Sequence, residues 1–366
     1  MKIRRITIDL RMYAHSGIGR YLHNLMPLLV PQLHADALRI LVPEQLVAGA
    51  AWLADTRIEL RDTSVPIYSV PEQMLGLRGA YRDTNLLWVP HINAPLWYRS
   101  RMAITLHDLS LIAIPELLPN SLKRGYAKLL IERAVAQAAA ILCVSEFTAS
   151  EAVSRLDVAP AKLTVTPLGV DPGWPSHAEP HREPDAVPYL LFVGNVKPNK
   201  NLSVLLTAFA RAGEVLPHRL VLAGRMRGFG TGDEAVIGQA EMLGDRVRWA
   251  GEVSDQQLIA LYAGATALVM PSLYEGFGLP VLEAMHFGCP VIAADTSSLP
   301  EVAQDAAIYF NPRDPEALYR CLLRVGDDTL MKSLGAAGQR RARHFSYARC
   351  AQQTANVLNR LLETNP

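Results

Sequence analysis

Residues 265–293, ATALVMPSLYEGFGLPVLEAMHFGCPVIA, contain a strand, a glycine loop and the beginning of a helix in direct succession. Ala265–Met270 is a short apolar run that is typical of a buried strand, and Val281–Phe287 has a helical apolar pattern. This pattern ends at Gly288, and Pro280 suits the first helical turn, where its missing N–H costs no hydrogen bond. A strand that leads directly into a helix is the repeating unit of a parallel α/β sheet.

The same stretch carries two acids, Glu275 and Glu283, beside a helix start. A helix start presents free N–H groups and the positive end of the helix dipole, so it can bind a phosphate. Acids are unexpected beside a phosphate alone, but their oxygens can accept hydrogen bonds from the hydroxyl groups of a ribose and a hexose. The stretch therefore predicts a nucleotide-sugar site. The alternative is that the acids only complement the helix dipole.

Apolar strand candidates alternate with helical stretches along the whole chain of 366 residues. In the first half the predicted strands are Ile3–Leu10, Leu38–Val42, Leu86–Val89, Met102–Leu106, Ala140–Val144 and Leu163–Val165. In the second half they are Tyr189–Val193, Arg219–Leu222, Val247–Trp249, Ala265–Met270, Pro290–Ala293 and Ala307–Phe310. This alternation predicts an α/β protein with two doubly wound, Rossmann-like parallel sheets.

The stretch 169–189 is rich in proline and lacks apolar periodicity, which predicts a linker. We expect an N-terminal domain over 1–170, a linker over 171–188 and a C-terminal domain over 189–344. Residues 345–366 are expected to form a helix that can cross back onto the N-terminal domain. Because ligands bind at the carboxyl ends of the strands in such sheets, the active site is expected in a cleft between the two domains.

The composition excludes several classes of protein. Half of the residues are hydrophobic and the net charge is +1, without the basic excess of a nucleic-acid-binding protein. No apolar run reaches the roughly 18 residues of a membrane span. The N-terminus MKIRRITIDL places charges inside its apolar stretch, unlike a signal peptide. The 4 cysteines fit no zinc pattern and are expected to be free thiols in a reducing, cytoplasmic environment.

Five segments together resemble the retaining GT-B glycosyltransferases of the family called glycosyl transferases group 1. Residues 271–285, PSLYEGFGLPVLEAM, resemble the signature of two acids separated by seven residues. The other segments follow in the expected order, and the resemblance extends over nearly the whole chain. They are 17–21 (GIGRY), 105–110 (TLHDLS), 144–148 (VSEFT) and 192–201 (FVGNVKPNKN). The resemblance implies a GT-B fold with an acceptor-binding N-terminal domain and a nucleotide-sugar-binding C-terminal domain.

The resemblance also implies how the donor is bound. Glu283, expected in the first helical turn, would accept both ribose hydroxyls, Glu275 would face the donor sugar, and Lys200 would contact an oxygen of the departing diphosphate. Asn195 stands where many relatives carry arginine, so one phosphate contact is expected to be missing or supplied by Lys197. The expected donor-binding residues are Gly17, Gly19, Asn195, Lys200, Glu275, Gly276, Phe277, Gly278, Leu279 and Glu283. The backbone N–H groups of the last loop residues would meet the diphosphate.

The glycines at the N-terminus also allow a different interpretation. Gly17 and Gly19 follow the first predicted strand and open a helix, as in a dinucleotide-binding fingerprint. The third glycine of that fingerprint is absent, since Leu22 stands there, and no acid ends the second strand. The family resemblance instead implies that this loop lies over the donor phosphates and the acceptor, with Arg20 nearby.

His107, Glu275 and Lys200 are the expected catalytic residues. His107 lies at the carboxyl end of a predicted parallel strand, and the matching histidine of the family lies by the reacting sugar. A purely structural histidine is the alternative. Asp108 is expected to orient the ring. The expected acceptor-binding residues are Arg20, Asp108 and Ser145.

The implied reaction is the transfer of a hexose with retention of configuration. The segments look most like bacterial mannosyltransferases that use GDP-mannose in lipopolysaccharide or exopolysaccharide synthesis. No Asp-x-Asp pair occurs in the chain, so neither a metal nor any cofactor beyond the nucleotide-sugar donor is expected. No side chain is an obvious nucleophile, which favours same-face attack with the leaving phosphate taking the acceptor proton. A UDP-sugar donor, a GT-B-fold nucleotide-sugar epimerase and a non-catalytic nucleotide-sugar-binding subunit are the alternatives.

The expected acceptor is a glycan or a polyprenyl-diphosphate-linked glycan, and no nucleic acid is expected to bind. The helix Tyr126–Arg133, with Lys123 and Arg124 beside it, is basic and amphipathic. Such a helix can rest on an anionic membrane, which would place the protein peripherally at the inner face. An ordinary solvated helix fits this sequence equally well.

Overall fold

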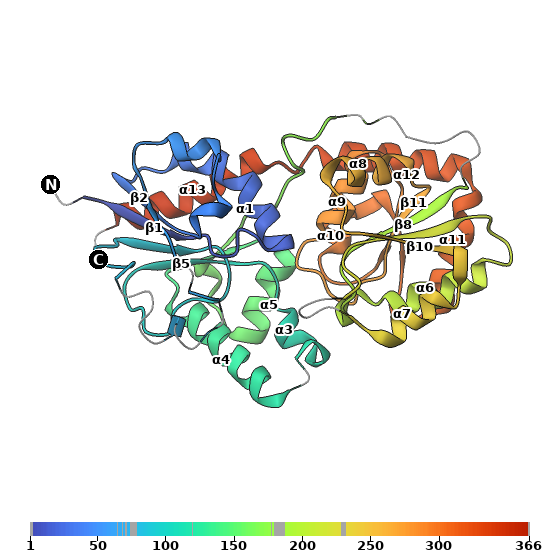
Figure 1. The fold of residues 1–366 in the computed structure, drawn as a ribbon, viewed down its shortest axis with the longest axis horizontal. Helices are drawn as coiled ribbons and strands as arrows, with labels where there is room; N and C mark the ends of the chain where they lie inside the picture. The colour runs from blue at the N-terminus through green and yellow to red at the C-terminus, as the bar shows by residue number, and fades with distance from the viewer. Residues whose placement is uncertain are drawn as a thin grey trace. The chain divides into compact units, whose positions relative to one another are not determined.

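The computed structural model describes residues 3–63, 65–67, 69, 72–73, 79–118, 120–176, 178, 187–227 and 232–364. The chain folds into two compact units (Figure 1). Unit 1 comprises Met1–Ala113, Pro119–Pro172 and Ser346–Pro366, and unit 2 comprises Ile114–Leu118 and Gly173–Phe345. Residues 177 and 179–186 of the predicted linker lie outside the described residues.

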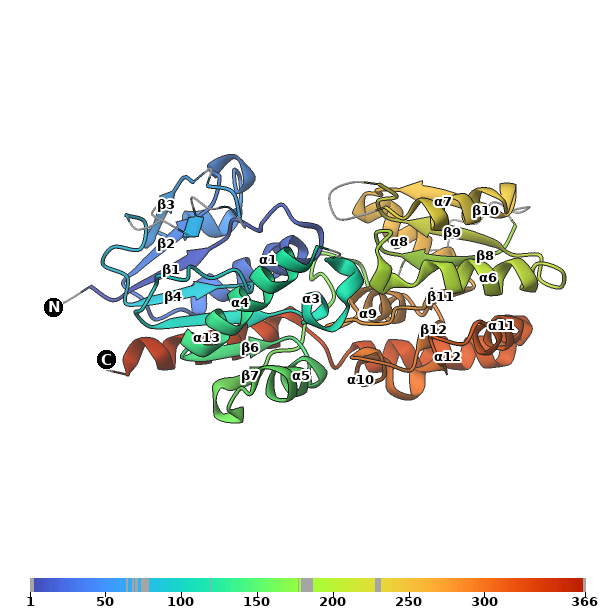
Figure 2. The ribbon, with the colours of Figure 1, turned by 90° about the horizontal axis from the view of Figure 1, so that it is seen from below.

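Unit 1 is built on a parallel seven-stranded sheet in the order β3-β2-β1-β4-β5-β6-β7 (Figure 2). Its strands are β1 (Arg5–Asp9), β2 (Ala37–Leu41), β3 (Ile58–Arg61), β4 (Leu86–Val89), β5 (Met102–Leu106), β6 (Ala140–Cys143) and β7 (Leu163–Val165). The prediction missed β3. This edge strand reads IELR and is only partly buried, so it has no apolar run that would mark it.

The helices of unit 1 lie on both faces of this sheet. They are α1 (Ser16–Leu29), α3 (Ser110–Ala113), α4 (Ser121–Gln137), α5 (Glu146–Leu156) and α13 (Tyr347–Glu363). Figure 1 shows α1 and α13 on one side of the strands and α4 and α5 on the other. The C-terminal α13 packs against α1 and β4, so the end of the chain completes the sheet face begun at its start.

Unit 2 is built on a parallel six-stranded sheet in the order β10-β9-β8-β11-β12-β13. Its strands are β8 (Tyr189–Val193), β9 (Arg219–Ala223), β10 (Val247–Gly251), β11 (Ala267–Met270), β12 (Val291–Ala294) and β13 (Ala307–Phe310). Its helices are α6 (Leu202–Ala212), α7 (Glu234–Glu241), α8 (Asp255–Gly264), α9 (Leu279–His286), α10 (Leu299–Ala303), α11 (Pro315–Leu323) and α12 (Asp328–Ala342). α6 and α7 lie on one side of the sheet, and α8 and α9 on the other (Figure 1).

The two sheets confirm the predicted fold class of two Rossmann-like, doubly wound domains. The central strands β4, β5, β11 and β12 are buried along their whole length, which explains their continuous apolar sequences. The strand order reverses once in each sheet, between β1 and β4 and between β8 and β11. Such a reversal is where ligands bind in sheets of this kind, outside the carboxyl ends of the strands.

The glycine-loop helix begins earlier than its apolar pattern indicates. α9 starts at Leu279, two residues before the predicted Val281, because Gly278 is the N-cap residue and Pro280 lies in the first turn. Gly278 has a φ of 101°, in the left-handed region that glycine adopts without strain. Across the helices that the structure describes, none combines the length and the apolar character that a membrane crossing requires.

Candidate functional site

The glycine loop of unit 2 leads from β11 into α9 at the point where the strand order reverses. No side chain in the described part of the chain caps the first turn of α9. The backbone is tightly placed, since a Cβ atom added to Gly278 would lie 2.8 Å from a methyl carbon of Leu299. In the first turn of α9 Pro280 has no N–H, and the N–H groups of Val281 and Leu282 donate to the carbonyl of Gly278. An anion would therefore meet the N–H of Leu279 and the loop backbone before it, at the positive end of the helix dipole.

Lys200 and Glu275 form an ion pair between the loops that follow β8 and β11, the two strands at which the strand order of unit 2 reverses. Lys200 ends the short turn after β8, and Glu275 lies in the loop after β11. The Nζ atom of Lys200 donates to Oε1 of Glu275 at 2.6 Å, and the two side chains are 16% and 12% exposed. The sequence predicted both residues for the site but not their contact. The pair is short and partly accessible, so a strong anion could replace the carboxylate as the partner of Lys200.

The main chain of Glu275 is held by two serines from the loop after β12. The N–H of Glu275 donates to the hydroxyl of Ser297 at 3.1 Å, and the hydroxyl of Ser298 donates to the carbonyl of Glu275 at 2.9 Å. These contacts fix the backbone on both sides of the acid while its carboxylate contacts Lys200. Sequence reasoning missed both serines because their contacts lie more than twenty residues from Glu275 and follow no motif.

Glu283 is buried and lies in the second turn of α9. The prediction of a first-turn position is wrong, because α9 begins at Leu279 and its first turn contains no acid. The residue is 4% exposed, and the hydroxyl of Tyr262 donates to its Oε2 atom at 2.8 Å. Tyr262 is a further residue that the sequence did not indicate, since a tyrosine in an apolar helix resembles any core aromatic residue.

Asn195 links the ends of two neighbouring strands. Its Oδ1 atom accepts the N–H of Arg225 at 2.9 Å, which ties the loop after β8 to the loop after β9. The side chain therefore has a structural partner in addition to its predicted place near the phosphates. Its contact with the donor stays a prediction.

In unit 1, His107 directly follows β5 and its tautomer is fixed by a backbone carbonyl. The Nε2 atom lies 3.0 Å from the carbonyl oxygen of Pro90. Because a carbonyl can only accept, Nε2 carries the hydrogen and Nδ1 is left as an acceptor. Burial lowers the pKa of His107 to about 4, against the opposing effects of the Pro90 carbonyl and the Asp108 charge. The ring is therefore neutral at physiological pH.

The sequence predicted that Asp108 orients the ring of His107, and this prediction is wrong. The Oδ1 atom of Asp108 instead accepts the N–H and the hydroxyl of Ser110 at 2.8 Å and 2.6 Å, at the start of α3. Pro90 takes over the orienting role because it directly follows β4, the strand beside β5 in the sheet. Tyr21 also packs edge-on against the imidazole, with ring centroids 4.9 Å apart.

The other predicted residues of unit 1 lie at helix starts. Gly17, Gly19 and Arg20 belong to the first turns of α1, and a Cβ atom on Gly19 would lie 2.4 Å from the carbonyl oxygen of Tyr13. Ser145 is the N-cap residue of α5, where its fully buried hydroxyl accepts the N–H of Thr148. Ser145 thus has a clear structural role, and its contact with a substrate stays a prediction.

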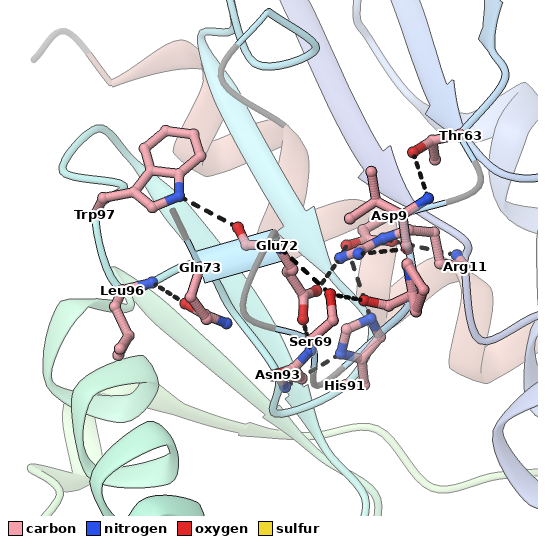
Figure 3. Close-up of polar contacts among 12 residues, drawn as sticks. Asp9, Arg11, Thr63, Ser69, Glu72, Gln73, His91, Asn93, Leu96 and Trp97 are labelled. Atoms are coloured by element: carbon pink, nitrogen blue, oxygen red, sulfur yellow. Dashed lines mark hydrogen bonds and ion pairs between the residues drawn. The ribbon is translucent and has the colours of Figure 1, made fainter. Parts of the chain in front are cut away.

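The reversal in unit 1 carries a buried set of charged and polar groups that the sequence analysis did not single out (Figure 3). This unit-1 polar cluster consists of Asp9, Arg11, Glu72, His91 and Asn93. Asp9 ends β1 and His91 and Asn93 follow β4, the two strands at the reversal. The five residues are at most 6% exposed. The cluster occupies the same position in its sheet as the Lys200–Glu275 pair does in unit 2.

Arg11 joins the two acids of the unit-1 polar cluster. Its guanidinium binds Asp9 through Nε at 2.8 Å and through Nη2 at 2.5 Å, and Nη2 lies 2.5 Å from Oε1 of Glu72. Burial is the largest single effect on the pKa of Asp9 and would raise it, but the Arg11 charge and the hydrogen bonds from His91 and Arg11 together outweigh burial and hold this pKa well below its usual range. One cation thus serves two buried carboxylates.

The polar cluster also fixes the turn that carries Pro90. The side-chain amide of Asn93 donates to Oε2 of Glu72 at 2.7 Å, and the N–H of Asn93 donates to Nδ1 of His91 at 3.1 Å. These bonds hold the residues directly after Pro90, whose carbonyl orients His107. The buried charges and the histidine at the strand end therefore belong to one connected arrangement.

Within the ranges that the structure describes, no group of three or more His, Cys, Asp and Glu side chains is arranged to hold a metal ion. The four cysteines are buried and unpaired with one another.

Two family sequence models match the chain. The one described as "Glycosyl transferases group 1" matches residues 175–341, and the one described as "Glycosyltransferase Family 4" matches residues 81–174. The chain is 34% identical over 274 residues to an O-antigen chain mannosyltransferase B of Escherichia coli, and the match covers 70% of each chain. It is 33% identical over 248 residues to an MMP alpha-(1->4)-mannosyltransferase of Mycolicibacterium hassiacum, covering 66% of this chain and 59% of the relative.

Solved glycosyltransferase structures share the fold over nearly the whole chain. A sucrose-phosphate synthase from Thermosynechococcus elongatus matches with a TM-score of 0.74 and 19% identity, covering 98% of this chain and 99% of that chain. Anabaena HepE in complex with UDP and glucose matches with a TM-score of 0.71 and 18% identity, covering 97% and 99% of the two chains. At this level of identity the likeness concerns the fold.

The unit-1 polar cluster predicts a large loss of stability when Arg11 is replaced by methionine. Arg11→Met leaves Asp9 and Glu72 buried without the cation that they share, and removing one partner of a buried ion pair typically costs about 3–5 kcal/mol. Thermal unfolding followed by circular dichroism measures the effect. Arg4→Met is the control, because the pair between Arg4 and Asp36 is about half exposed and should change stability by less than about 1 kcal/mol. Similar melting temperatures for both variants would contradict the interpretation.

Proposed function

The chain belongs to the glycosyl transferases group 1 family, and from this membership we propose that it transfers mannose from GDP-mannose to a glycan acceptor with retention of configuration. The proposed acceptor is a growing lipopolysaccharide or exopolysaccharide chain, free or linked to polyprenyl diphosphate. Two mannosyltransferases among the relatives support the choice of sugar. The free, buried cysteines are consistent with a reducing, cytoplasmic location.

The observation that carries the proposal is the Lys200–Glu275 ion pair beside the uncapped start of α9. In the proposed complex the donor diphosphate binds the N–H of Leu279 and the loop backbone before it, and takes over Lys200 as its partner. The diphosphate carries two negative charges, and its oxygens make strong charge-assisted hydrogen bonds with an ammonium group. Glu275 is thereby released from Lys200, and its carboxylate can accept a hydrogen bond from a hydroxyl group of the donor sugar.

Lys200 and the α9 dipole would also stabilise the nucleoside diphosphate as it leaves. Negative charge develops on the diphosphate when the bond to the sugar breaks, and fixed donors aimed at that charge lower the barrier. We propose that these groups act in place of a metal ion. Transfer is therefore expected to continue in the presence of EDTA.

His107 is proposed to contact the reacting sugar through Nδ1. This atom is an acceptor because Nε2 donates to Pro90, so it can receive a hydrogen bond from a sugar hydroxyl. A neutral ring suits this task, since a charged imidazolium could only donate. No proton is moved by His107 in this scheme, and the leaving phosphate takes the proton of the acceptor hydroxyl.

A UDP-sugar donor is the second candidate, because HepE among the structural neighbours is described in complex with UDP and glucose. An epimerase of the same fold would need a base placed to remove a proton from the sugar ring. Formation of an epimer without acceptor would favour that alternative.

Calorimetric titration with GDP-mannose and with UDP-glucose tests the donor assignment. GDP-mannose should bind more tightly, and Lys200→Met should weaken its binding by about tenfold or more, since the substitution removes a charge-assisted hydrogen bond. Lys332→Met, which changes an exposed lysine of α12, is the control and should bind as the unchanged protein does. Adding EDTA should leave both binding and transfer unchanged. Tighter binding of UDP-glucose would overturn the choice of donor, and unchanged affinity of Lys200→Met would overturn the site.

The role of His107 is tested by His107→Ala. Turnover should fall by roughly 10²-fold or more, the usual scale for a side chain at the reacting centre, while donor affinity changes little. Because the pKa of His107 is lowered to about 4, the rate should show no step near pH 6.5 that depends on this residue. His34→Ala, at an exposed position of the same unit, is the control. A residual activity that only follows a reduced folded fraction would show that His107 is a structural residue.

The acceptor is proposed to reach the protein at a membrane surface through α4. Leu122, Tyr126 and Leu129 are 82%, 41% and 46% exposed and recur at helical spacing on one face, with Lys123 and Lys128 beside them. Such a face can insert between anionic lipids. Sedimentation with vesicles containing phosphatidylglycerol should recover the protein, and replacing the three apolar residues by serine should abolish the recovery. Met242→Ser, which changes an equally exposed residue of unit 2, is the control, and equal recovery of all variants would contradict the proposal.

A further inference from the structure

Tyr262 lies in the interior of unit 2, and its hydroxyl contacts one of the two acids of the glycine-loop signature. It lies near the end of α8 and is 0% exposed. The hydroxyl donates to Oε2 of Glu283 on α9 at 2.8 Å. Because α8 and α9 pack against each other, this bond joins two adjacent helices on one face of the sheet.

The position of this hydroxyl is fixed by the groups around it. The ring of Tyr262 stacks with that of Phe287 at an interplanar angle of 16° and a centroid distance of 6.3 Å. Trp174 packs against it from another direction, at 6.4 Å. The hydroxyl of Tyr189 donates to the carbonyl of Leu261 at 2.8 Å and ties the end of α8 to β8. The tyrosine therefore cannot turn away from Glu283 without disturbing this packing.

A fixed hydroxyl determines how the carboxylate of Glu283 is turned. The last torsion of a glutamate side chain has a broad, shallow preference, so an isolated carboxylate samples many orientations. A carboxylate accepts hydrogen bonds, and Tyr262 must therefore act as the donor. The bond to Oε2 selects one orientation and sets the directions in which the group can accept further hydrogen bonds.

We propose that Tyr262 is a positioning residue that holds Glu283 in the orientation needed to accept both ribose hydroxyls of a nucleoside diphosphate. The proposal rests on the proposed function, because it takes Glu283 as the ribose ligand. Two neighbouring hydroxyls on a ring require two acceptor directions at the same time. A carboxylate that is already oriented avoids the cost of ordering this group when the nucleotide binds.

The test compares GDP with 2′,3′-dideoxy-GDP in calorimetric titrations, and the ratio of their dissociation constants gives the ribose preference. The unchanged protein should prefer GDP by about tenfold or more, the scale of one charge-assisted hydrogen bond. Glu283→Ala should abolish the preference. Tyr262→Phe keeps the ring and its stacking, and should reduce the preference by about threefold or more while binding of the dideoxy nucleotide stays the same. In a protein carrying both substitutions, Tyr262→Phe should have no additional effect.

Tyr189→Phe is the matched control, because it removes a hydroxyl that binds the adjacent Leu261 carbonyl but does not contact Glu283. It should lower the melting temperature slightly and leave the ribose preference unchanged. If GDP does not bind, UDP and 2′,3′-dideoxy-UDP are used in the same way.

The outcomes separate the inference from the function on which it rests. A Glu283→Ala variant that keeps the ribose preference, or an unchanged protein that binds neither GDP nor UDP, overturns the assignment of Glu283 and with it the inference. If Glu283→Ala loses the ribose preference but Tyr262→Phe keeps it, the positioning role of Tyr262 is wrong, while Glu283 stays the ribose ligand. Equal weakening of both nucleotides by Tyr262→Phe would show that Tyr262 only supports the packing of α8, and this too would overturn it.

Discussion

The reversal of strand order in each sheet decides where the loops that carry the site residues lie. Where two adjacent parallel strands send their helices to opposite faces, the loops after them separate and leave room for a ligand. In unit 2 these strands are β8 and β11, and in unit 1 they are β1 and β4. In unit 2 the Lys200–Glu275 pair lies in the loops after β8 and β11. In unit 1 Asp9 ends β1, His91 and Asn93 follow β4, and His107 follows the neighbouring β5. The strand order alone therefore predicts the position of a ligand site in each sheet, independently of the side chains.

The two reversals use charge in different ways. In unit 2 the paired charges of Lys200 and Glu275 remain partly accessible, at 16% and 12% exposed. A ligand can compete for such a pair, and the carboxylate that it displaces becomes available to another part of the same ligand. In unit 1 the side chains of Arg11 and Asp9 are 2% and 0% exposed, so their pair is closed off from solvent in this structure. Buried charges of this kind cost desolvation energy and contribute little net stability. Their effect here is to hold the Pro90 turn and, through it, the tautomer of His107.

Much of this arrangement could be predicted from the sequence where the signal is local. The glycine loop, the strand before His107 and the turn that carries Lys200 are each marked by a few adjacent residues, and the structure contains the corresponding elements. β3 could not be found in this way because a short edge strand with Glu59 and Arg61 lacks an apolar run. The first-turn position of Glu283 was wrong because the apolar pattern begins two residues after the true helix start.

Contacts between distant segments could not be predicted. Glu72 reaches Asn93 and Arg11 across gaps of many residues, and Tyr262 looks like any buried aromatic residue until its hydroxyl is seen against Glu283. The role assigned to Asp108 failed for a related reason. The residue next to His107 in the sequence points to Ser110, whereas Pro90 on the neighbouring strand is next to His107 in space. Which loops lie beside each other in a parallel sheet depends on the strand order, and the strand order cannot be predicted from a single sequence.

We propose that a nucleoside diphosphate binds at the strand reversal in unit 2 and replaces Glu275 as the partner of Lys200. A crystal structure of the protein with GDP bound tests this claim most directly. We expect a phosphate oxygen within hydrogen-bonding distance of Lys200 Nζ and of the N–H of Leu279, with Glu275 no longer paired to Lys200. A nucleotide bound elsewhere, or a Lys200–Glu275 pair that stays intact beside the bound diphosphate, would contradict it.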